Sequence, residues 1–161
     1  MSEAADWRED RIGSADRGEN PLVLARMRSG VAVIGDTQFL PGYSVLLCSD
    51  PTVQQLTDLE MDARSEFLLD MTLLGAAVQL ACRSNGFRRM NYEILGNMMP
   101  ELHAHLIPRY EWEPPYNRAR EALSYGEEVW FAEQHAYSDA EHGELRAVIT
   151  EHVERLMADT Y

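Results

Sequence analysis

Residues 91–110 read NYEILGNMMPELHAHLIPRY, and the segment from Glu101 to Arg109 at its centre decides the fold. Polar and apolar side chains alternate in this segment: Glu101, His103 and His105 against Leu102, Ala104 and Leu106. A period of two predicts a half-buried β-strand with one polar face and one core face. Side chains on the same face of a strand are spaced by about 6.5–7 Å. The carboxylate and the two imidazoles therefore form one short row, which indicates a reactive site.

The composition indicates one soluble domain. The chain has 161 residues, of which 45% are hydrophobic and 25% charged, values typical of a globular protein of that size. Its formal net charge of −13 argues against general affinity for nucleic acid or an anionic membrane. Two cysteines are too few for a disulfide framework or a cysteine-based zinc site.

The compartment is predicted from the same features and from two segments of the chain. Residues 1–20 lack the apolar core of a signal peptide. The apolar tract over residues 68–82 is interrupted by polar residues and is too short to span a bilayer. We therefore expect a cytoplasmic protein without a nucleic-acid or membrane partner.

The hydrophobic pattern predicts the α+β class. Strands are expected at residues 31–34, 43–48, 90–95 and 102–107. Helical spacing covers residues 58–84, and a capping box at Ser138–Glu141 begins a final amphipathic helix that reaches about residue 157. Two strand pairs separated by a helix predict an antiparallel sheet with helices on one side.

The remaining segments complete the predicted organisation. Residues 1–20 are expected to form a flexible arm that docks through Trp7, and residues 21–161 a single domain. Residues 21–27 are expected to form a helical turn. Residues 111–137 are rich in aromatic side chains, proline and glutamate but show no clear period, so a long loop is expected there.

His103 is a candidate nucleophile, with His105 beside it as a proton carrier. An imidazole attacks only when it is neutral and when an acceptor holds its other nitrogen. Attack on phosphorus suits such a group, because a phosphohistidine divides one displacement into two steps. The preceding Gly96-Asn97 could offer N–H groups and a side-chain amide to phosphate oxygens.

The segment ELHAHLIPR resembles the signature of the histidine-triad (HIT) superfamily, His-φ-His-φ-His-φ-φ, commonly continued by Pro-Arg, where φ is an apolar residue. His103 and His105 match its second and third histidines, and Glu101 replaces the first. Upstream, PGYSVLLC resembles the Pro-Gly-His strand of the family, with Tyr43 in place of its histidine. The resemblance covers about residues 31–110.

The resemblance implies a HIT-like antiparallel sheet with one long helix between strand pairs and a C-terminal helix. It implies a hydrolase of nucleotide phosphoanhydrides or phosphoramidates, or a nucleotidyl transferase, similar to diadenosine polyphosphate hydrolases and needing no cofactor. Family members are usually homodimers in which the long helix and a central strand pair across a two-fold axis.

The same resemblance implies a role for each candidate site residue. His103 would attack the α-phosphorus and form a nucleotidyl-histidine, while His105 would contact the phosphate or the leaving group. Asn97 would contact the phosphate, and Asp36 would hold the ribose. Glu101 is placed with the substrate-binding residues, and its main-chain carbonyl would hold the second nitrogen of His103.

Glu101 also leaves two alternatives open. A carboxylate at the first position of the triad repels an incoming phosphate, so the chain could instead be a non-catalytic nucleotide-binding protein. Two histidines and one carboxylate also resemble the ligand set of an iron or zinc site. Binding without turnover would indicate the first alternative, and metal in the purified protein the second.

Overall fold

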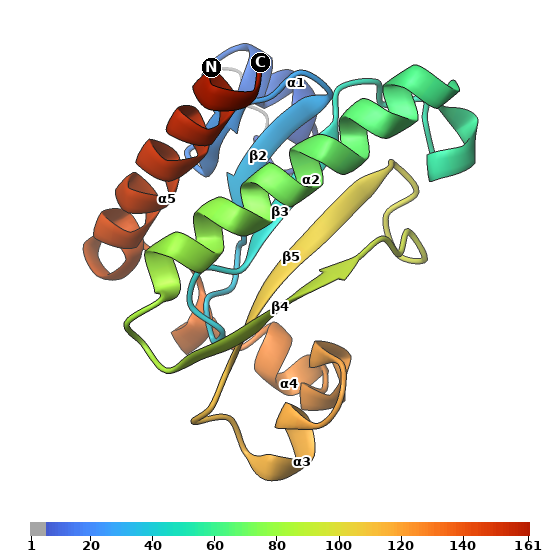
Figure 1. Ribbon diagram of the computed structural model, residues 1–161. Helices are drawn as coiled ribbons and strands as arrows, with labels where there is room; N and C mark the ends of the chain where they lie inside the picture. The colour runs from blue at the N-terminus through green and yellow to red at the C-terminus, as the bar shows by residue number, and fades with distance from the viewer. Residues whose placement is uncertain (1–5) are drawn as a thin grey trace, which may run out of the picture.

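In the computed structural model, which describes residues 6–161, five strands form one antiparallel sheet in the order β1-β2-β3-β5-β4 (Figure 1). The strands are β1 (Val23–Arg26), β2 (Gly30–Ile34), β3 (Ser44–Cys48), β4 (Phe87–Glu93) and β5 (His103–Tyr110). This arrangement confirms the predicted α+β class. Strand β5, which carries the histidines, is paired on both sides, with β3 and with β4.

Two long helices cover one face of the sheet: α2 (Met61–Cys82) and α5 (Asp139–Thr160). Figure 1 shows α2 lying across β3 and β5 with α5 beside it, next to β1 and β2. The shorter helices are α1 (Arg11–Asp16), η1 (Leu56–Asp58), α3 (Pro115–Arg118), η2 (Ala122–Tyr125), α4 (Glu127–Trp130) and η3 (Glu133–His135). Figure 1 places α3 and α4 beyond the end of β5, away from α2.

The core lies between α2, α5 and the sheet. Ala104 and Leu106 of β5 are fully buried there, as are Leu74 and Val78 of α2. Because successive strand residues point to opposite faces, His103 and His105 are turned away from α2. The alternation of the sequence therefore predicted which face of β5 is packed.

Helix α2 extends further than the apolar tract that the sequence analysis considered. Its 22 residues are long and apolar enough to cross a membrane by length and composition alone. In this fold, however, Phe67, Leu74 and Val78 are fully buried within the core. Core helices of soluble proteins meet the same criterion of length and hydropathy. The buried side chains of α2 are those of such a core helix.

The start of the domain differs from the prediction. The helical turn expected at residues 21–27 was wrong, since Val23–Arg26 forms β1 and pairs with β2. The pairing joins Val23 to Val33 and Ala25 to Ala32. Residues 23–26 form a strand because they pair with the β-branched residues of β2. The sequence of residues 21–27 alone does not contain that information.

The N-terminal segment lies against the domain from residue 6 onward, while residues 1–5 of the expected arm are outside the described part. Helix α1 is capped by the side chain of Asp10, which accepts from the N–H of Gly13 at 2.9 Å. Trp7 packs against the hydrophobic core, as expected for the docking residue. Arg11 reaches from α1 to Asp36, 25 positions along the chain.

The final helix begins where the sequence predicts, with Ser138 as its N-cap, but the side chain of Ser138 makes no capping hydrogen bond. Its backbone N–H instead donates to Nδ1 of His142 at 3.1 Å. His142 therefore satisfies the group that Glu141 was expected to satisfy.

Candidate active site

The two histidines occupy the centre of the sheet face that α2 and α5 leave uncovered. In the register of the sheet, His103 pairs with Leu47 of β3, and His105 pairs with Val45 of β3 and Glu93 of β4. Their ring centroids are 4.8 Å apart, with the ring planes at 79°. Both are partly buried, so a ligand can reach them on a rigid strand.

A hydrogen bond fixes the tautomer of His103. Its Nδ1 lies 2.6 Å from the main-chain carbonyl oxygen of Glu101. A carbonyl oxygen can only accept, so Nδ1 carries the hydrogen, and in the neutral ring Nε2 keeps its lone pair. The contact that the resemblance implied for Glu101 is therefore present. Nε2 of His103 makes no hydrogen bond within the described residues, which leaves it available to an electrophile.

Tyr43 holds the second histidine. Its phenol oxygen lies 2.7 Å from Nδ1 of His105. Burial, followed by the charge of His103, lowers the pKa of His105 to about 4, so this imidazole is neutral at pH 7. Burial also raises the pKa of Tyr43, which keeps the phenol protonated and able to donate. Donation to Nδ1 leaves the hydrogen of His105 on Nε2, facing the site.

Glu101 and Asn97 lie outside the strand. Strand β5 begins at His103, so the expectation that Glu101 belongs to the strand was wrong. The carbonyl of Leu102 accepts from the N–H of Cys48 at the end of β3, its N–H donates to the carbonyl of Val53, and Glu101 lies in a bend before the first ladder pair. Asn97 is exposed in the loop after β4 and makes no side-chain hydrogen bond within the described residues.

Asp36 is engaged by the N-terminal segment. Arg11 donates to both carboxylate oxygens of Asp36, at 2.9 and 2.5 Å. Asp36 also lines a cavity of about 230 Å³ with Trp7 and Tyr137, a cavity that neither histidine lines. Its charge nevertheless contributes, after burial, to the raised pKa of Tyr43. Among the described residues, Tyr43 is the one that links Asp36 to the histidines.

Glu93 is a site residue that the sequence analysis did not select. It pairs with His105 across β4 and β5, and it is partly buried. Burial raises the pKa of Glu93; the charge of Arg109 opposes this and the charge of Glu121 adds to it. Strand pairing, rather than any local motif, brings this carboxylate beside the histidines.

Arg109 is a structural residue of the site. It is 3% exposed and forms a buried ion pair with Glu113, whose carboxylate oxygen lies 2.7 Å from its Nη2. Burial opposes ionisation of Glu113, but hydrogen bonds from Arg109, from the N–H of Tyr110 and from Tyr125 outweigh it and lower the pKa of Glu113. Arg109 also donates to the carbonyls of Asn117 and Arg120. It thereby fastens the segment after β5 to the sheet.

The aromatic residues of the expected loop divide into two groups. Tyr125 and Trp130 pack against the core, both in edge contact with Phe39, and Trp130 also contacts Tyr43. Trp112 and Tyr116 are exposed. The structured segment therefore supports Tyr43, and with it His105, from the side opposite α2.

The described residues do not favour the metal alternative. Over residues 6–161, no group of three or more His, Cys, Asp or Glu side chains is arranged to hold a metal ion. Glu101, the carboxylate considered for such a site, precedes the strand that carries the histidines.

The comparison with protein families agrees with the geometry. The family model described as "HIT domain" matches residues 31–112, from β2 through the end of β5. The chain belongs to the HIT family. A comparison with curated proteins finds no match.

Solved HIT structures share the fold over nearly the whole chain. A histidine triad protein from Sinorhizobium meliloti 1021 is 18% identical with a TM-score of 0.67, covering 94% of this chain and 97% of its own. A histidine triad protein from Marinobacter aquaeolei VT8 is 20% identical with a TM-score of 0.63, covering 83% and 89%. A Hit-like protein from Bartonella henselae is 15% identical with a TM-score of 0.64, covering 93% and 99%. These likenesses establish the HIT fold.

Proposed function

We propose that this HIT protein hydrolyses or transfers nucleotides through a nucleotidyl-histidine on His103, with phosphoanhydrides or phosphoramidates as substrates. The observation that carries the proposal is the 2.6 Å contact between Nδ1 of His103 and the carbonyl of Glu101. It leaves Nε2 with a lone pair on the open face of the sheet, the arrangement that a nucleophilic imidazole requires.

The proposed reaction has two displacements. In the first, Nε2 of His103 bonds to the α-phosphorus while the bond from that phosphorus to the leaving group breaks. A phosphate leaving group departs as an anion, whereas an amine departs after taking a proton from solvent water. In the second, water attacks the α-phosphorus, loses a proton to solvent and frees His103. The Nε2–H of neutral His105 donates to a phosphate oxygen or to the leaving group during both steps.

Two further residues are proposed to bind the nucleotide. Asn97 contacts the phosphate from its exposed loop, and Asp36 holds the ribose once Arg11 releases it. The backbone of Glu101 serves His103, while its carboxylate takes the place of the first histidine of the HIT signature. That carboxylate favours a second candidate function, nucleotide binding without turnover.

The test is intact mass spectrometry after brief exposure to nucleotide phosphoramidates and dinucleoside polyphosphates, quenched without acid. Wild type, His103→Ala and Glu101→His are treated in parallel. We expect a nucleotidyl adduct on wild type that is absent from His103→Ala. An adduct that persists in His103→Ala would contradict the assignment of the nucleophile.

Glu101→His separates the two candidate functions. Turnover by the wild type supports the enzyme. Activity in Glu101→His but not in wild type would show that Glu101 has suppressed the chemistry and that the protein acts by binding. Neither adduct nor product in wild type and in Glu101→His would reject catalysis by His103.

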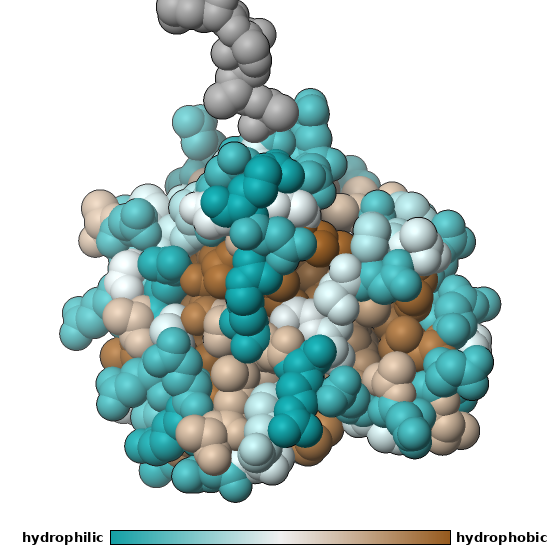
Figure 2. Space-filling model, turned by 90° about the horizontal axis from the view of Figure 1, so that it is seen from above, coloured by the Kyte–Doolittle hydropathy of each residue, from teal (hydrophilic) through white to brown (hydrophobic). Residues whose placement is uncertain are grey.

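We also propose a homodimer in the cytoplasm. Large apolar side chains are exposed on α2 (Met61, Leu68 and Leu69) and on the edge strand β4 (Tyr92). Figure 2 shows hydrophobic surface among polar side chains at the end of the molecule where α2 begins. A second copy would cover this surface and pair the free edge of β4. The free, buried Cys48 and Cys82 are compatible with a reducing compartment.

A further inference from the structure

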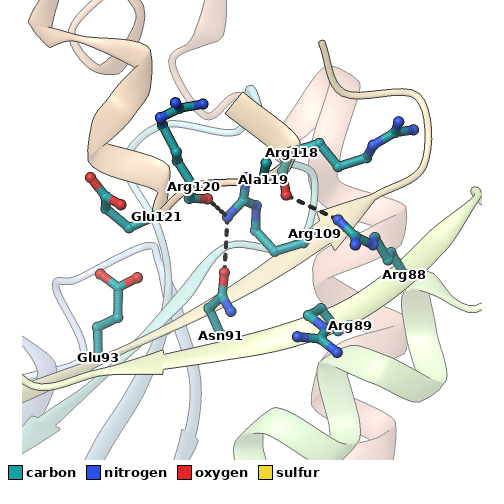
Figure 3. A pocket seen from close by; sticks show the side chains of 9 residues that line it. All are labelled: Arg88, Arg89, Asn91, Glu93, Arg109, Arg118, Ala119, Arg120 and Glu121. Carbon is teal, nitrogen blue, oxygen red and sulfur yellow. Dashed lines mark hydrogen bonds between the residues drawn. The ribbon is translucent and has the colours of Figure 1, made fainter. Parts of the chain in front are cut away.

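A cavity of about 370 Å³ lies between the β4–β5 edge of the sheet and the segment at residues 118–121 (Figure 3). Five arginines line it: Arg88, Arg89, Arg109, Arg118 and Arg120. These are more than a third of the 14 basic residues in a chain whose net charge is −13. Positive charge is therefore concentrated at one place in an otherwise acidic protein.

Arg109 builds the cavity wall and is not free to bind a ligand. Its guanidinium donates to Glu113, to Asn91 at 2.9 Å and to the carbonyls of Asn117 and Arg120. Figure 3 shows it between Asn91 and the segment that carries Arg120. Its charge is compensated by Glu113, so the attraction for an anion must come from the other four arginines.

Two of the other arginines have few side-chain interactions with the described residues. The guanidinium of Arg89 makes no hydrogen bond or ion pair with any described residue. Arg120 donates to the carbonyl of Tyr116 at 2.9 Å and stacks on that ring, with its central carbon 3.7 Å from the ring centroid. Neither guanidinium has a carboxylate partner among the described residues.

Arg88 and Arg118 share one exposed partner, Glu111, at 3.7 and 3.6 Å. Arg88 also donates to the carbonyl of Arg118 at 3.0 Å, and Arg118 to the carbonyl of Glu111 at 2.6 Å. Exposed ion pairs of this kind contribute little, about 0–1 kcal/mol. Their guanidinium groups can therefore turn toward a stronger anion.

The cavity adjoins the histidines on the same sheet face. Glu93 lines it and pairs with His105, and Asn91 lines it and pairs with Ile107. Figure 3 shows the carboxylates of Glu93 and Glu121 at one end and the side chains of Arg88 and Arg118 at the other. Five arginines and two glutamates give the lining a formal charge of +3.

We propose that this cavity binds a chain of condensed phosphates, held by Arg88, Arg89, Arg118 and Arg120. A guanidinium pairs with phosphate oxygens through two parallel hydrogen bonds, so four of them around one cavity suit a multiply charged anion. The volume lies within the range of small-molecule sites. The phosphate chain is either the leaving group of a nucleotide that reacts with His103, a role that rests on the proposed function, or a free polyphosphate.

The test is calorimetric titration with inorganic tripolyphosphate. The cavity variant combines Arg89→Gln with Arg120→Gln, one change on each wall. The matched control combines Arg28→Gln with Arg155→Gln, two exposed arginines that do not line the cavity and whose loss removes the same charge. We expect affinity at least tenfold weaker in the cavity variant and nearly unchanged in the control and in His103→Ala. Equal weakening in the cavity variant and the control, or no binding by wild type, would overturn the proposal.

A competition experiment separates the two sources of the chain. If the cavity holds the leaving group, a nucleoside tetraphosphate displaces tripolyphosphate from His103→Ala, while the nucleoside monophosphate does not. If it holds a free polyphosphate, both nucleotides bind together with tripolyphosphate. Binding without any nucleotidyl adduct on wild type would leave the cavity established and reject the proposed function. A nucleotidyl adduct on wild type, together with equal tripolyphosphate binding in all variants, would support the proposed function and reject the cavity as the binding site.

Discussion

The phenol oxygen of Tyr43 lies 2.7 Å from Nδ1 of His105, across the β3–β5 pair. Tyr43 precedes β3, in a segment that resembles the Pro-Gly-His strand of the family with tyrosine in place of the histidine. The contact sets the orientation of His105 and directs its Nε2–H to the open face. A residue that departs from the family pattern is thus built into the site.

Tyr43→Phe is expected to slow nucleotidyl transfer to His103 about tenfold, because His105 loses the donor that fixes its tautomer. Two measurements check this: the rate of adduct formation by mass spectrometry, and the ¹⁵N shifts of the His105 ring by NMR. Tyr116→Phe is the control, since Tyr116 is 61% exposed and its hydroxyl makes no hydrogen bond within the described residues. Unchanged rate and ring shifts in Tyr43→Phe would refute the positioning role.

The burial of His105 predicts a loss of stability in acid. Its pKa is about 4 in the fold, against a usual value of 6.5. Between these values the unfolded chain binds the proton and the native protein does not, so stability falls as the pH falls below about 6.5. By pH 5 this histidine is expected to lower the free energy of unfolding by about 2 kcal/mol. Urea denaturation at pH 7.5 and pH 5 should show a smaller difference for His105→Asn than for wild type; equal differences would count against this cause.

Glu101→Gln is expected to strengthen the binding of a nucleoside monophosphate about fivefold. A unit charge about 7 Å from a phosphate contributes about 1 kcal/mol of repulsion at an intermediate dielectric constant. The substitution keeps the main-chain carbonyl, so the contact to His103 is retained. Titration calorimetry measures the change, and Glu154→Gln on the exposed side of α5 controls for net charge. The idea fails if both variants gain affinity equally.

Glu113→Gln is expected to destabilise the protein by about 3 kcal/mol, because it leaves the guanidinium of Arg109 buried without its counter-charge. Glu111→Gln is the matched change at an exposed pair and is expected to cost less than 1 kcal/mol. Chemical denaturation compares the two. Similar small losses in both variants would show that the ion pair does not fasten residues 113–121.

The proposed dimer predicts that light scattering gives twice the mass of one chain. Leu69→Glu places a charge on the exposed face of α2, where Leu69 is 40% exposed, and should yield monomers. Leu123→Glu is the control, since Leu123 is 57% exposed and belongs to η2 rather than to α2 or β4. A monomeric wild type, or a dimer that persists in Leu69→Glu, would contradict the proposed interface.

The features that the sequence predicted well depend on a periodic spacing of apolar residues. The alternation around His103 gave the packed face of β5, and the apolar spacing gave α2. The features that it missed depend on pairing between distant segments. Strand β1 is a strand because β2 lies beside it.

The same limit applies to the site, where contacts between distant segments were not predicted. The contact between His103 and the carbonyl of Glu101 was implied by the resemblance to the HIT family, and the structure contains it. Glu93 reaches His105, and Arg11 reaches Asp36, only because the sheet and α1 bring them together. The short helices after β5 are less than two turns long, too short for a hydrophobic period to appear.

His103, His105 and Arg109 all belong to one strand that is hydrogen-bonded on both sides. A strand advances about 3.3 Å per residue and does not stretch, so the distance from the attacking nitrogen to the arginine-lined cavity is set by the backbone. A movement of the segment at residues 118–121 would shift Arg118 and Arg120 but not the wall of the cavity on β5. We therefore expect the protein to select its substrates by the number of phosphate groups between the α-phosphorus and the far end of the polyphosphate.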